Sequence, residues 1–578
     1  MRSTSVARSI PVRLGLALAA FAAFLALAPP VPGQVYVVHQ IPGNLNNSSF
    51  GWAVAGIGDA NADGVPDFAI GAPSASPSGV SCCFAGQITL HSGATGAVFT
   101  TISGSVAGAR LGGSLVGLGD LDGDGKGDFA AGMQFVSATL PYEVRVYSGG
   151  SGSLLYTLTG PAGSGFGSSL APAGDVTGDG KTDLLVGAQG ADAPGLPFAG
   201  QAFVHSGANG APVWTFNGLA VGELLGFSVA GPGDLNGDLI PDLLVGAPTA
   251  VPPGAVLARG QVRAFSGATG APLFTLNGSF DDENFGGSVA RAGDVDADGV
   301  PDFVVDAPFY ALLPAGTPIG RTLVYSGANN AILHTFTGVT QGCDQNPILG
   351  GEDLTGDGVL DLVIGRTCLN SLRVYSTPGW NPLATVTGPA GHQLGRSLAS
   401  VGDVDADGYP DFLAGLPQQP LVGQARVYSF AGVPAGSSLY GTGCAGSGGF
   451  VPQIRALGGV PSLGNSQFAL SASKTLGGAG AFLVLGVSST AWGPVPLPFN
   501  LGILGLPACS LLASVDVLFT TAATGAGAGG GSAILPAPIP NDPVLAGGTV
   551  YCQWAIADTG VAPLPVAMTR GIQLVILP

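Results

Sequence analysis

The stretch DLDGDGKGD, residues 120–128, places four aspartates and three glycines in nine positions of a 578-residue chain in which only 9% of the residues are charged. Similar nine-residue stretches start at residues 59, 175, 234, 294, 353 and 403. In chain order, the seven stretches are loops one to seven. Their regular spacing along the chain indicates a tandem array of seven equivalent units.

Each unit contains the same succession of short apolar segments around its acidic loop. In the fifth unit FGGSVARAGD (285–294) precedes the loop, and in the fourth unit DLLVGAP (242–248) follows it, succeeded by QVRAFSGATG (261–270) and PLFTLNG (272–278). Short apolar runs bounded by Gly, Pro and Asn predict strands, so each unit is predicted to hold four. A tandem repeat whose units each hold four short strands predicts propeller blades.

The two ends of the array predict how it closes. The seventh unit has three strand-like segments, near 394–401, 411–416 and 425–430, but no fourth. The segment VYVVHQIPG (35–43) precedes FGWAVAGIGD just as PLFTLNG precedes FGGSVARAGD. We therefore predict an all-β fold in which this N-terminal strand completes the seventh blade and closes the ring, so that two strand edges are hidden.

These repeats resemble the FG-GAP repeats of integrin α-chain propellers. Phe-Gly pairs begin at Phe50, Phe166 and Phe285, and Gly-Ala-Pro begins at Gly71 and Gly246. The resemblance runs from Val35 to around Phe430 and implies a seven-bladed β-propeller with calcium in the loops between first and second strands. Unit six departs from the pattern, because ILGGEDL replaces the Phe-Gly strand and GRT replaces Gly-Ala-Pro. That blade is expected to be irregular.

The acidic loops suit calcium on chemical grounds as well. Calcium takes six to eight oxygen ligands, and side chains at the first, third, fifth and ninth positions, with the backbone carbonyl of the seventh, can converge on one point. A glycine at the sixth position supplies the left-handed turn that this needs. The predicted ligands are Asp59, Asn61, Asp63, Val65, Asp67; Asp120, Asp122, Asp124, Lys126, Asp128; Asp175, Thr177, Asp179, Lys181, Asp183; Asp234, Asn236, Asp238, Ile240, Asp242; Asp294, Asp296, Asp298, Val300, Asp302; Asp353, Thr355, Asp357, Val359, Asp361; and Asp403, Asp405, Asp407, Tyr409, Asp411.

The seven sites are not expected to be equal. Loops two, five and seven have four aspartates, whereas loop one has Asn at the third position and loops three and six have Thr there. Loop four has Leu239 in place of the sixth-position glycine and is predicted to bind most weakly. The alternative interpretation is that Asp, Asn and Gly only form hairpin turns; seven matched loops favour calcium.

The charge balance points to cations rather than nucleic acid. The chain has 36 acidic and 18 basic residues, a net charge of −18. Nucleic-acid binding needs a basic face, so we expect no nucleic-acid partner.

Residues 1–33 are predicted to be a secretory signal. Arginines precede an apolar run from Leu14 to Leu27, followed by small residues and prolines. This run is shorter than the roughly 20 residues that a membrane-spanning helix needs, so an anchor is the weaker alternative. We expect a secreted protein, extracellular or at the cell surface, with no transmembrane segment in the mature chain.

Seven cysteines fit an oxidising compartment. The predicted disulfides are Cys343–Cys368 and Cys444–Cys509. Cys82 and Cys83 are adjacent, and Cys552 is left over. No Cys-x-x-Cys pair occurs, which argues against zinc.

No catalytic constellation is evident. His91 and His205 stand where other units have Tyr or Phe, so they are predicted core residues, and a structural or solvated role is the simplest interpretation of His392. Arg291 and Arg396 fall in predicted inner strands, where a wall or surface role is the simpler interpretation. A site assembled from several blades stays open.

The acidic repeats stop after Phe430. We predict a propeller over 34–436 and a smaller β-sandwich over 437–578, with strands in QFALSAS, AFLVLGVSS, SLLASVDVLFTT, VYCQWAIAD and IQLVIL. TGAGAGGGSA is predicted to be a flexible turn.

The sequence is compatible with three functions. The leading one is an extracellular binding or cell-adhesion module without enzymatic activity, whose ligand is an unidentified protein or glycan. The alternatives are a polysaccharide-active enzyme and a purely structural envelope protein. Loops such as Ser279–Asn284 and Asn44–Ser49 are expected on the face opposite the calcium, where we expect a ligand to bind.

Overall fold

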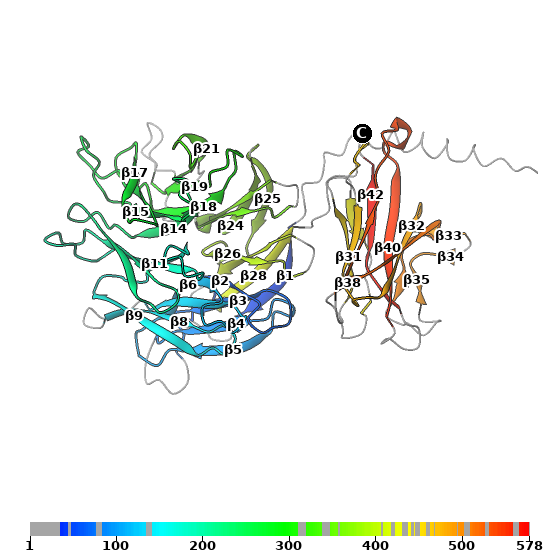
Figure 1. Ribbon diagram of the computed structural model, residues 1–578, viewed down its shortest axis with the longest axis horizontal. Coiled ribbons are helices and arrows are strands. Elements are labelled where there is room, and N and C mark those ends of the chain that lie inside the picture. Colours follow the sequence, from blue (N-terminus) through cyan, green and yellow to red (C-terminus); the bar gives the residue numbers. More distant parts are fainter. Residues whose placement is uncertain are drawn as a thin grey trace, which may run out of the picture.

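The described part of residues 35–430 forms seven four-stranded antiparallel sheets in the computed structural model, and strands also dominate the C-terminal region (Figure 1). The structure describes the chain except residues 1–34, 44–47, 77–83, 134–140, 310–319, 338–346, 356–358, 378, 406–408, 418–421, 431–436, 441–443, 446–450, 458–462, 467–468, 494, 502–508, 526–530, 559–565 and 577–578. Among the described residues the helical elements are two short 3-10 turns, η2 (Thr367–Leu369) and η5 (Pro543–Leu545). The predicted signal, residues 1–33, lies outside the described residues.

We number the sheets by the acidic loop that each contains. Sheet one comprises β2 (Ala53–Gly58), β3 (Asp67–Ala72), β4 (Gln87–His91) and β5 (Val98–Ser103); sheet two, β6 (Leu111–Gly119), β7 (Asp128–Met133), β8 (Pro141–Tyr147) and β9 (Leu154–Ala162); sheet three, β10 (Ser169–Gly174), β11 (Asp183–Ala188), β12 (Gln201–His205) and β13 (Pro212–Asn217); sheet four, β14 (Ser228–Gly233), β15 (Asp242–Ala247), β16 (Gln261–Phe265) and β17 (Pro272–Asn277). Sheet five comprises β18 (Ser288–Gly293), β19 (Asp302–Ala307), β20 (Arg321–Tyr325) and β21 (Ile332–Thr337); sheet six, β22 (Ile348–Glu352), β23 (Asp361–Arg366), β24 (Ser371–Ser376) and β25 (Asn381–Thr387); sheet seven, β26 (Leu398–Gly402), β27 (Asp411–Leu416), β28 (Gln424–Phe430) and β1 (Val35–Pro42).

The N-terminal strand completes the seventh sheet. β1 pairs antiparallel with β28, from Val35 opposite Phe430 to Pro42 opposite Gln424. This pairing confirms the prediction made from the missing fourth strand. It joins the first and last strands of the repeat array and covers the outer edge of β28.

The inner strands of the seven sheets contact one another in sequence. β2 packs against β6, β6 against β10, and so on through β14, β18, β22 and β26, and β26 packs against β2. Each sheet therefore has two neighbouring sheets, an arrangement consistent with a β-propeller.

Glycine pairs allow neighbouring sheets to approach closely. A Cβ on Gly187 of β11 would lie 2.1 Å from the carbonyl oxygen of Gly226, which precedes the inner strand of the next sheet. The same crossing joins Gly415 to Gly51, where the distance would be 2.0 Å. At the same crossing Gly246 of a Gly-Ala-Pro segment meets Gly286 of a Phe-Gly pair, where the distance would be 2.2 Å. This close approach explains why glycine recurs at both positions.

The hydrophobic core lies between adjacent sheets. One cluster joins Phe68 and Ile70 of sheet one to Leu413 and Val427 of sheet seven. The second strands have a neighbour on both faces, and every residue of β3, β11 and β15 is buried. The fourth strands β5, β17 and β21 alternate between exposed and partly buried residues, because they form the outer edges.

The sixth sheet forms despite its divergent sequence. β22 pairs with β23 from Ile348 opposite Ile364 to Glu352 opposite Asp361. The expected irregularity is therefore wrong for strand pairing. Within the described residues of this unit, a short turn, η2, lies in the connection between β23 and β24.

The C-terminal strands form two sheets that share one core. The first has the order β29 (Ser437–Tyr440), β42 (Gly571–Val575), β40 (Thr549–Ala557), β32 (Gly480–Gly486), β37 (Val517–Ala522), with β41 (Val566–Met568) on β40; the second has the order β30 (Gln453–Leu457), β31 (Ala469–Thr475), β39 (Gly531–Pro536), β38 (Thr524–Gly525); two small hairpins are β33 (Ala491–Trp492) with β34 (Val495–Pro496) and β35 (Phe499–Asn500) with β36 (Ser510–Leu511). Leu470 and Ala472 of the second sheet pack with Leu483, Trp554 and Ile572 of the first.

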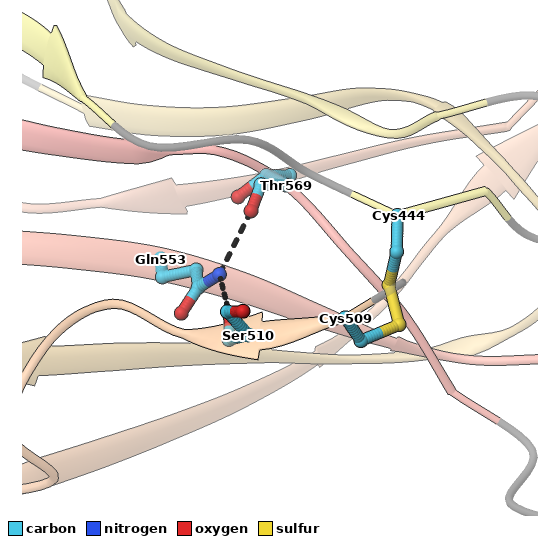
Figure 2. Close-up of a disulfide and its surroundings, with 5 residues drawn as sticks. All are labelled: Cys444, Cys509, Ser510, Gln553 and Thr569. Carbon is cyan, nitrogen blue, oxygen red and sulfur yellow. Dashed lines mark hydrogen bonds between the residues drawn. A yellow bond between two sulfur atoms is a disulfide. The ribbon is translucent and has the colours of Figure 1, made fainter. Parts of the chain in front are cut away.

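The C-terminal region contains the predicted disulfide Cys444–Cys509 (Figure 2). Beside it, the Gln553 side-chain amide donates hydrogen bonds to the carbonyl oxygens of Ser510 (3.0 Å) and Thr569 (2.8 Å), which tie β40 to two neighbouring segments. Cys552 is free and buried, as expected, and burial raises the pKa of its thiol to about 12. In the predicted pair Cys343–Cys368, Cys343 lies outside the described residues, as do Cys82 and Cys83. No helix in the described residues has the length and apolar character needed to cross a membrane.

Candidate metal centre

The acidic loops all join an inner strand to the second strand of the same sheet. The first-position aspartate follows the inner strand or lies at its end, and the ninth-position aspartate is the first residue of the second strand in every sheet. Position five of loops six and seven, Asp357 and Asp407, lies outside the described residues. The other predicted side-chain ligands are described.

The ninth-position aspartate joins three segments of its sheet. Asp67 is fully buried; its Oδ2 accepts hydrogen bonds from the backbone N–H groups of Ala60 and Asn61, both at 2.9 Å, and its Oδ1 accepts one from Gly93 at 2.9 Å. Hydrogen bonds from at least one backbone N–H of the loop and from a more distant glycine N–H recur at Asp128, Asp183, Asp242 and Asp302. This carboxylate therefore has a structural role in addition to the predicted metal role.

Burial makes these aspartates harder to ionise. It raises the pKa of Asp67, Asp242 and Asp302 to about 6, although backbone N–H donors act in the opposite direction. Burial also raises the pKa of Asp128 and Asp183. A cation beside such a carboxylate would favour its charged form.

The first- and fifth-position aspartates shape the loop itself. Asp59 accepts hydrogen bonds from the N–H groups of Asp63 (3.1 Å) and Gly64 (2.9 Å). Asp63 in turn accepts one from the seventh-position N–H of Val65 (2.9 Å) and one from the Ser92 hydroxyl (3.0 Å). These residues therefore do form turns. Their carboxylates still have further oxygen lone pairs that could bind a metal.

Two positions of the loop need left-handed backbone. The sixth position has φ of 85° at Gly64 and, as predicted, the left-handed value of 68° at Leu239 in loop four. The fourth position is also left-handed, with φ of 62° at Ala62 and 59° at Ala297. This second position was not predicted from the sequence, although Gly at position four of loops two, three, four and six was a signal for it.

Three loops bring carboxylates together in a way that suits a cation. In each, oxygens from the first, third and ninth positions lie within 4.8 Å of one another; the groups are Asp120, Asp122 and Asp128; Asp294, Asp296 and Asp302; and Asp403, Asp405 and Asp411. These belong to loops two, five and seven, the loops with four aspartates. Oxygen ligands at this separation fit calcium or magnesium better than a soft metal.

In loops one, three and four the third position is a hydrogen-bond donor. The Asn61 side-chain amide donates to Asp67 Oδ1 at 3.1 Å, and that of Asn236 donates to Asp242 Oδ1 at 3.1 Å. The Thr177 hydroxyl donates to the ninth carboxylate of loop three at 3.4 Å. These loops therefore have one carboxylate fewer, and their third-position side chain stabilises the ninth-position carboxylate by a hydrogen bond, whereas an aspartate side chain has no N–H to donate.

The structure shows where His91, Arg291 and Arg396 lie. His91 stacks on Phe68 with centroids 5.5 Å apart, in the way that Tyr147 stacks on Phe129, and burial lowers its pKa. His91 is thus a core residue, as predicted. Arg291 lies in inner strand β18 as expected, whereas Arg396 precedes β26 and lines a cavity at the start of the inner strands.

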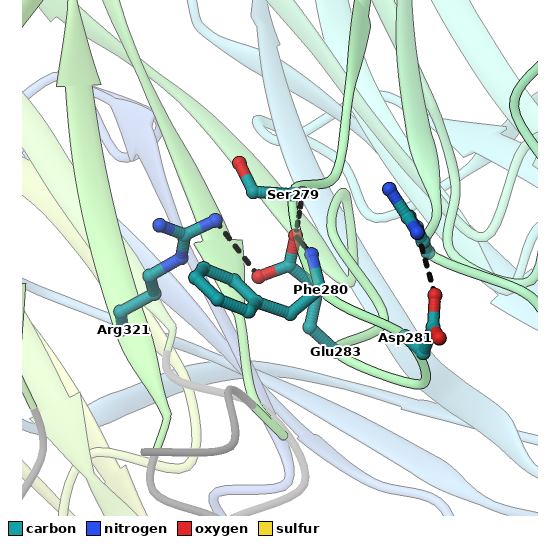
Figure 3. Close-up of polar contacts among 6 residues, drawn as sticks. Ser279, Phe280, Asp281, Glu283 and Arg321 are labelled. Atoms are coloured by element: carbon teal, nitrogen blue, oxygen red, sulfur yellow. Dashed lines mark hydrogen bonds and ion pairs between the residues drawn. The ribbon is translucent and has the colours of Figure 1, made fainter. Parts of the chain in front are cut away.

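The loop Ser279–Asn284 was predicted on the face opposite the calcium. Two of its three acidic residues form ion pairs with arginines outside the loop (Figure 3). Glu283 is fully buried; it pairs with Arg321 at 2.8 Å and accepts hydrogen bonds from the N–H groups of Ser279 and Phe280. Asp281 pairs with Arg259 at 2.7 Å. In Asn44–Ser49, residues 44–47 lie outside the described part.

Comparison with known proteins identifies the repeats. The FG-GAP repeat family matches residues 50–91 and 166–205, which are the first three strands of sheets one and three. Over 211 residues the chain is 34% identical to integrin alpha-V of Gallus gallus, which covers 34% of this chain and 20% of the relative. It is 29% identical to integrin alpha-5 of Xenopus laevis over 225 residues, which are 36% of this chain and 20% of the relative. It is 33% identical to integrin alpha-IIb of Homo sapiens over 168 residues, which are 27% of this chain and 16% of the relative.

The matches thus span about a fifth of the length of these relatives. Among solved structures, a chain in the crystal structure of a mitotic checkpoint complex aligns over 70% of this chain and 98% of its own length, with 11% identity and a TM-score of 0.42.

Proposed function

We propose that this FG-GAP repeat protein, which resembles integrin α chains over about a third of its length, is a secreted calcium-binding β-propeller that acts as an extracellular binding or adhesion module without enzymatic activity. The observation that carries the proposal is the grouping of three carboxylates in each of loops two, five and seven.

The seven sheets are proposed to be the seven blades of one propeller over residues 34–436. The pairing of β1 with β28 and the succession of inner-strand contacts that returns from β26 to β2 support closure. Residues 437–578 are proposed to form a separate β-sandwich, which is supported by two sheets around a common core.

Calcium is proposed to occupy loops two, five and seven first. Their third-position aspartates add a negative charge where loops one and four have an amide donor. The remaining loops would bind more weakly, up to a total of seven ions, and loop four most weakly because Leu239 adopts a left-handed conformation. Bound ions would offset the repulsion within each group and would stiffen the corners between first and second strands.

Secretion is proposed from the signal-like residues 1–33, and the Cys444–Cys509 disulfide supports an oxidising compartment. The ligand is proposed to be an extracellular protein or glycan. Loops rigidified by metal at one end of the inner strands would leave the opposite end to hold it.

A metal count on the mature chain tests the calcium sites. After dialysis against calcium, native mass spectrometry is expected to find at least three ions per chain, and chelation is expected to lower the melting midpoint. The combined variant Asp122→Asn, Asp296→Asn, Asp405→Asn should bind these ions more weakly and retain fewer of them, whereas Asp281→Asn, outside the acidic loops, should retain as many as the wild type. A chain without bound calcium, whose melt ignores chelator, would refute the sites.

The binding function has its own test. Saturable binding to an array of extracellular proteins and glycans, without turnover, is expected. Turnover of a polysaccharide would favour the enzyme alternative, and absence of binding to any array member would favour the structural one.

A further inference from the structure

A cavity of about 380 Å³ lies where the inner strands begin. Each of the seven sheets contributes to it at least one residue from the start of its inner strand or from the two positions before that strand. Its volume is in the range of small-molecule sites, about 300–1,000 Å³. The metal loops lie at the other end of these strands, and six residues of strand place the two ends about 20 Å apart.

Arg396 gives this cavity a positive charge. Its guanidinium carbon lies 4.4 Å from the centroid of the Trp52 ring, which also lines the cavity and holds the guanidinium in place. The ion pairs found in the described part of the chain use other arginines, and none of them involves Arg396. Burial lowers the pKa of Arg396, as expected for a cation that has lost water without gaining an anion.

The rest of the lining is suited to a neutral, hydroxylated group. The buried Ser168 hydroxyl has no hydrogen-bond partner within the described structure, and the Gln189 amide also lines the cavity. Phe227, with Trp52, supplies apolar surface of the kind that packs against the C–H face of a sugar ring. One cation, a few hydrogen-bonding groups and aromatic surface together match a small hydroxy-acid.

The net charge narrows the class of ligand. A net charge of −18, with Arg396 as the one cation among the described residues that line the cavity, disfavours phosphate esters and polyanions, which need several cations. A single carboxylate matches the single guanidinium, which can bind it with two parallel hydrogen bonds.

We infer that this cavity binds one sugar carboxylate of the uronic-acid class, with Arg396 pairing to the carboxylate and Ser168 and Gln189 hydrogen-bonding to ring hydroxyls. The inference rests on the proposed binding function, for which it names a ligand, but the site contains no proposed calcium ligand. The acid could be a free monosaccharide or the terminal residue of a longer glycan.

Calorimetric titration of the mature, calcium-loaded chain tests the inference. Galacturonate and glucuronate are expected to bind at least tenfold more tightly than galactose and glucose, and more tightly than inorganic phosphate. Arg396→Gln should weaken binding of the acids at least tenfold, and Arg259→Gln, a surface arginine, should leave it unchanged. A tetrasaccharide ending in a uronate separates the two sources: tighter binding than the monosaccharide indicates a glycan end, and weaker binding a free sugar acid.

Equal affinity for acidic and neutral sugars, tighter binding of phosphate, or full affinity in Arg396→Gln would overturn the inference. If Arg396→Gln does not fold, as judged by its melt in calcium, Ser168→Ala and Trp52→Phe replace it and should each weaken binding of the acids. A chain that retains calcium but binds no uronate refutes the ligand alone. A chain that fails in both the metal count and this titration refutes the proposed function as well.

Discussion

The third position of the acidic loop is expected to decide whether a loop is more stable with or without calcium. In loop one the Asn61 amide donates to Asp67 Oδ1 at 3.1 Å. In loop two Asp122 has its oxygens within 4.8 Å of those of Asp120 and Asp128 and has no proton to offer. We predict that Asp122→Asn stabilises the calcium-free protein and weakens calcium binding at loop two, two effects of opposite sign from one substitution.

The expected change in stability follows from the distances between the carboxylate oxygens. Two unit charges 4.8 Å apart repel by about 0.9 kcal/mol in water-like surroundings, which are appropriate for this exposed loop. Removal of the Asp122 charge relieves two such pairs, and the new amide–carboxylate hydrogen bond adds about 1 kcal/mol before screening by salt. The calcium-free protein should gain about 1–2 kcal/mol, which raises the melting midpoint of a repeat region of this size by about 2 °C. The lost anionic ligand should weaken calcium binding at loop two on the order of tenfold.

Melting curves in chelator and in calcium test this prediction, at low and at moderate ionic strength. The reverse substitution Asn61→Asp is the matched control, because it should lower the midpoint in chelator and increase the response to calcium. A lower midpoint of Asp122→Asn in chelator would contradict the repulsion argument. Identical calcium responses in both variants and the wild type would contradict the ligand assignment.

Four further outcomes are expected. Leu239→Gly should stabilise the protein by about 1 kcal/mol in denaturant titrations, because Leu239 has φ of 68° and is 88% exposed. Gly187→Ala should destabilise it by about 1–3 kcal/mol or more in the same assay, because its Cβ would lie 2.1 Å from the Gly226 carbonyl oxygen. Reduction of Cys444–Cys509, which closes a 65-residue separation, should lower the unfolding free energy of the C-terminal region by about 4 kcal/mol, measured with and without reductant. Three ninth-position aspartates have a pKa of about 6 in the folded protein and an ordinary value of 3.8. Between these two pH values the folded state binds more protons than the unfolded state, so the calcium-free protein should become more stable as the pH falls from 7 to 5. Calcium competes with those protons, so the difference between melts with and without calcium should shrink over the same range; an unchanged difference would contradict this.

Much of the repeat architecture could be predicted because each unit contains its own strand and turn signals. The alternation of apolar residues with Gly, Pro and Asn determined where strands begin and end, and the second strands begin at the ninth-position aspartate as expected. The unpaired segment at 35–43 was enough to predict that β1 joins β28. Seven copies of the pattern made each local signal stronger than it would have been alone.

Features that depend on contacts between distant residues could not be predicted. The Asp67 carboxylate accepts a hydrogen bond from Gly93, 26 residues away, so a structural role is added to a residue that the spacing assigned to a metal alone. The C-terminal segment SLLASVDVLFTT shows the same limit. It was predicted as one strand but forms β36 and β37 in different sheets, because Asp516 accepts hydrogen bonds from the Ser514 hydroxyl and the Val487 N–H at the turn between them.

Residues at the two ends of each inner strand are under different structural constraints, and this difference bears on ligand specificity at the proposed site. At the end with the acidic loops, the side chains of the loop pattern are engaged in turn formation, in strand connection or in the carboxylate groups. At the other end, the Gly of the Phe-Gly pair must remain small because the neighbouring sheet crosses there, but the residue after it lines the cavity. That position holds Trp52, Ser168 and Phe227 in three sheets and Arg396 in the seventh. We therefore expect substitution at these positions to change ligand specificity at the proposed site and to leave the glycine crossings between sheets in place. Residues that lie far apart in the sequence would then set the specificity.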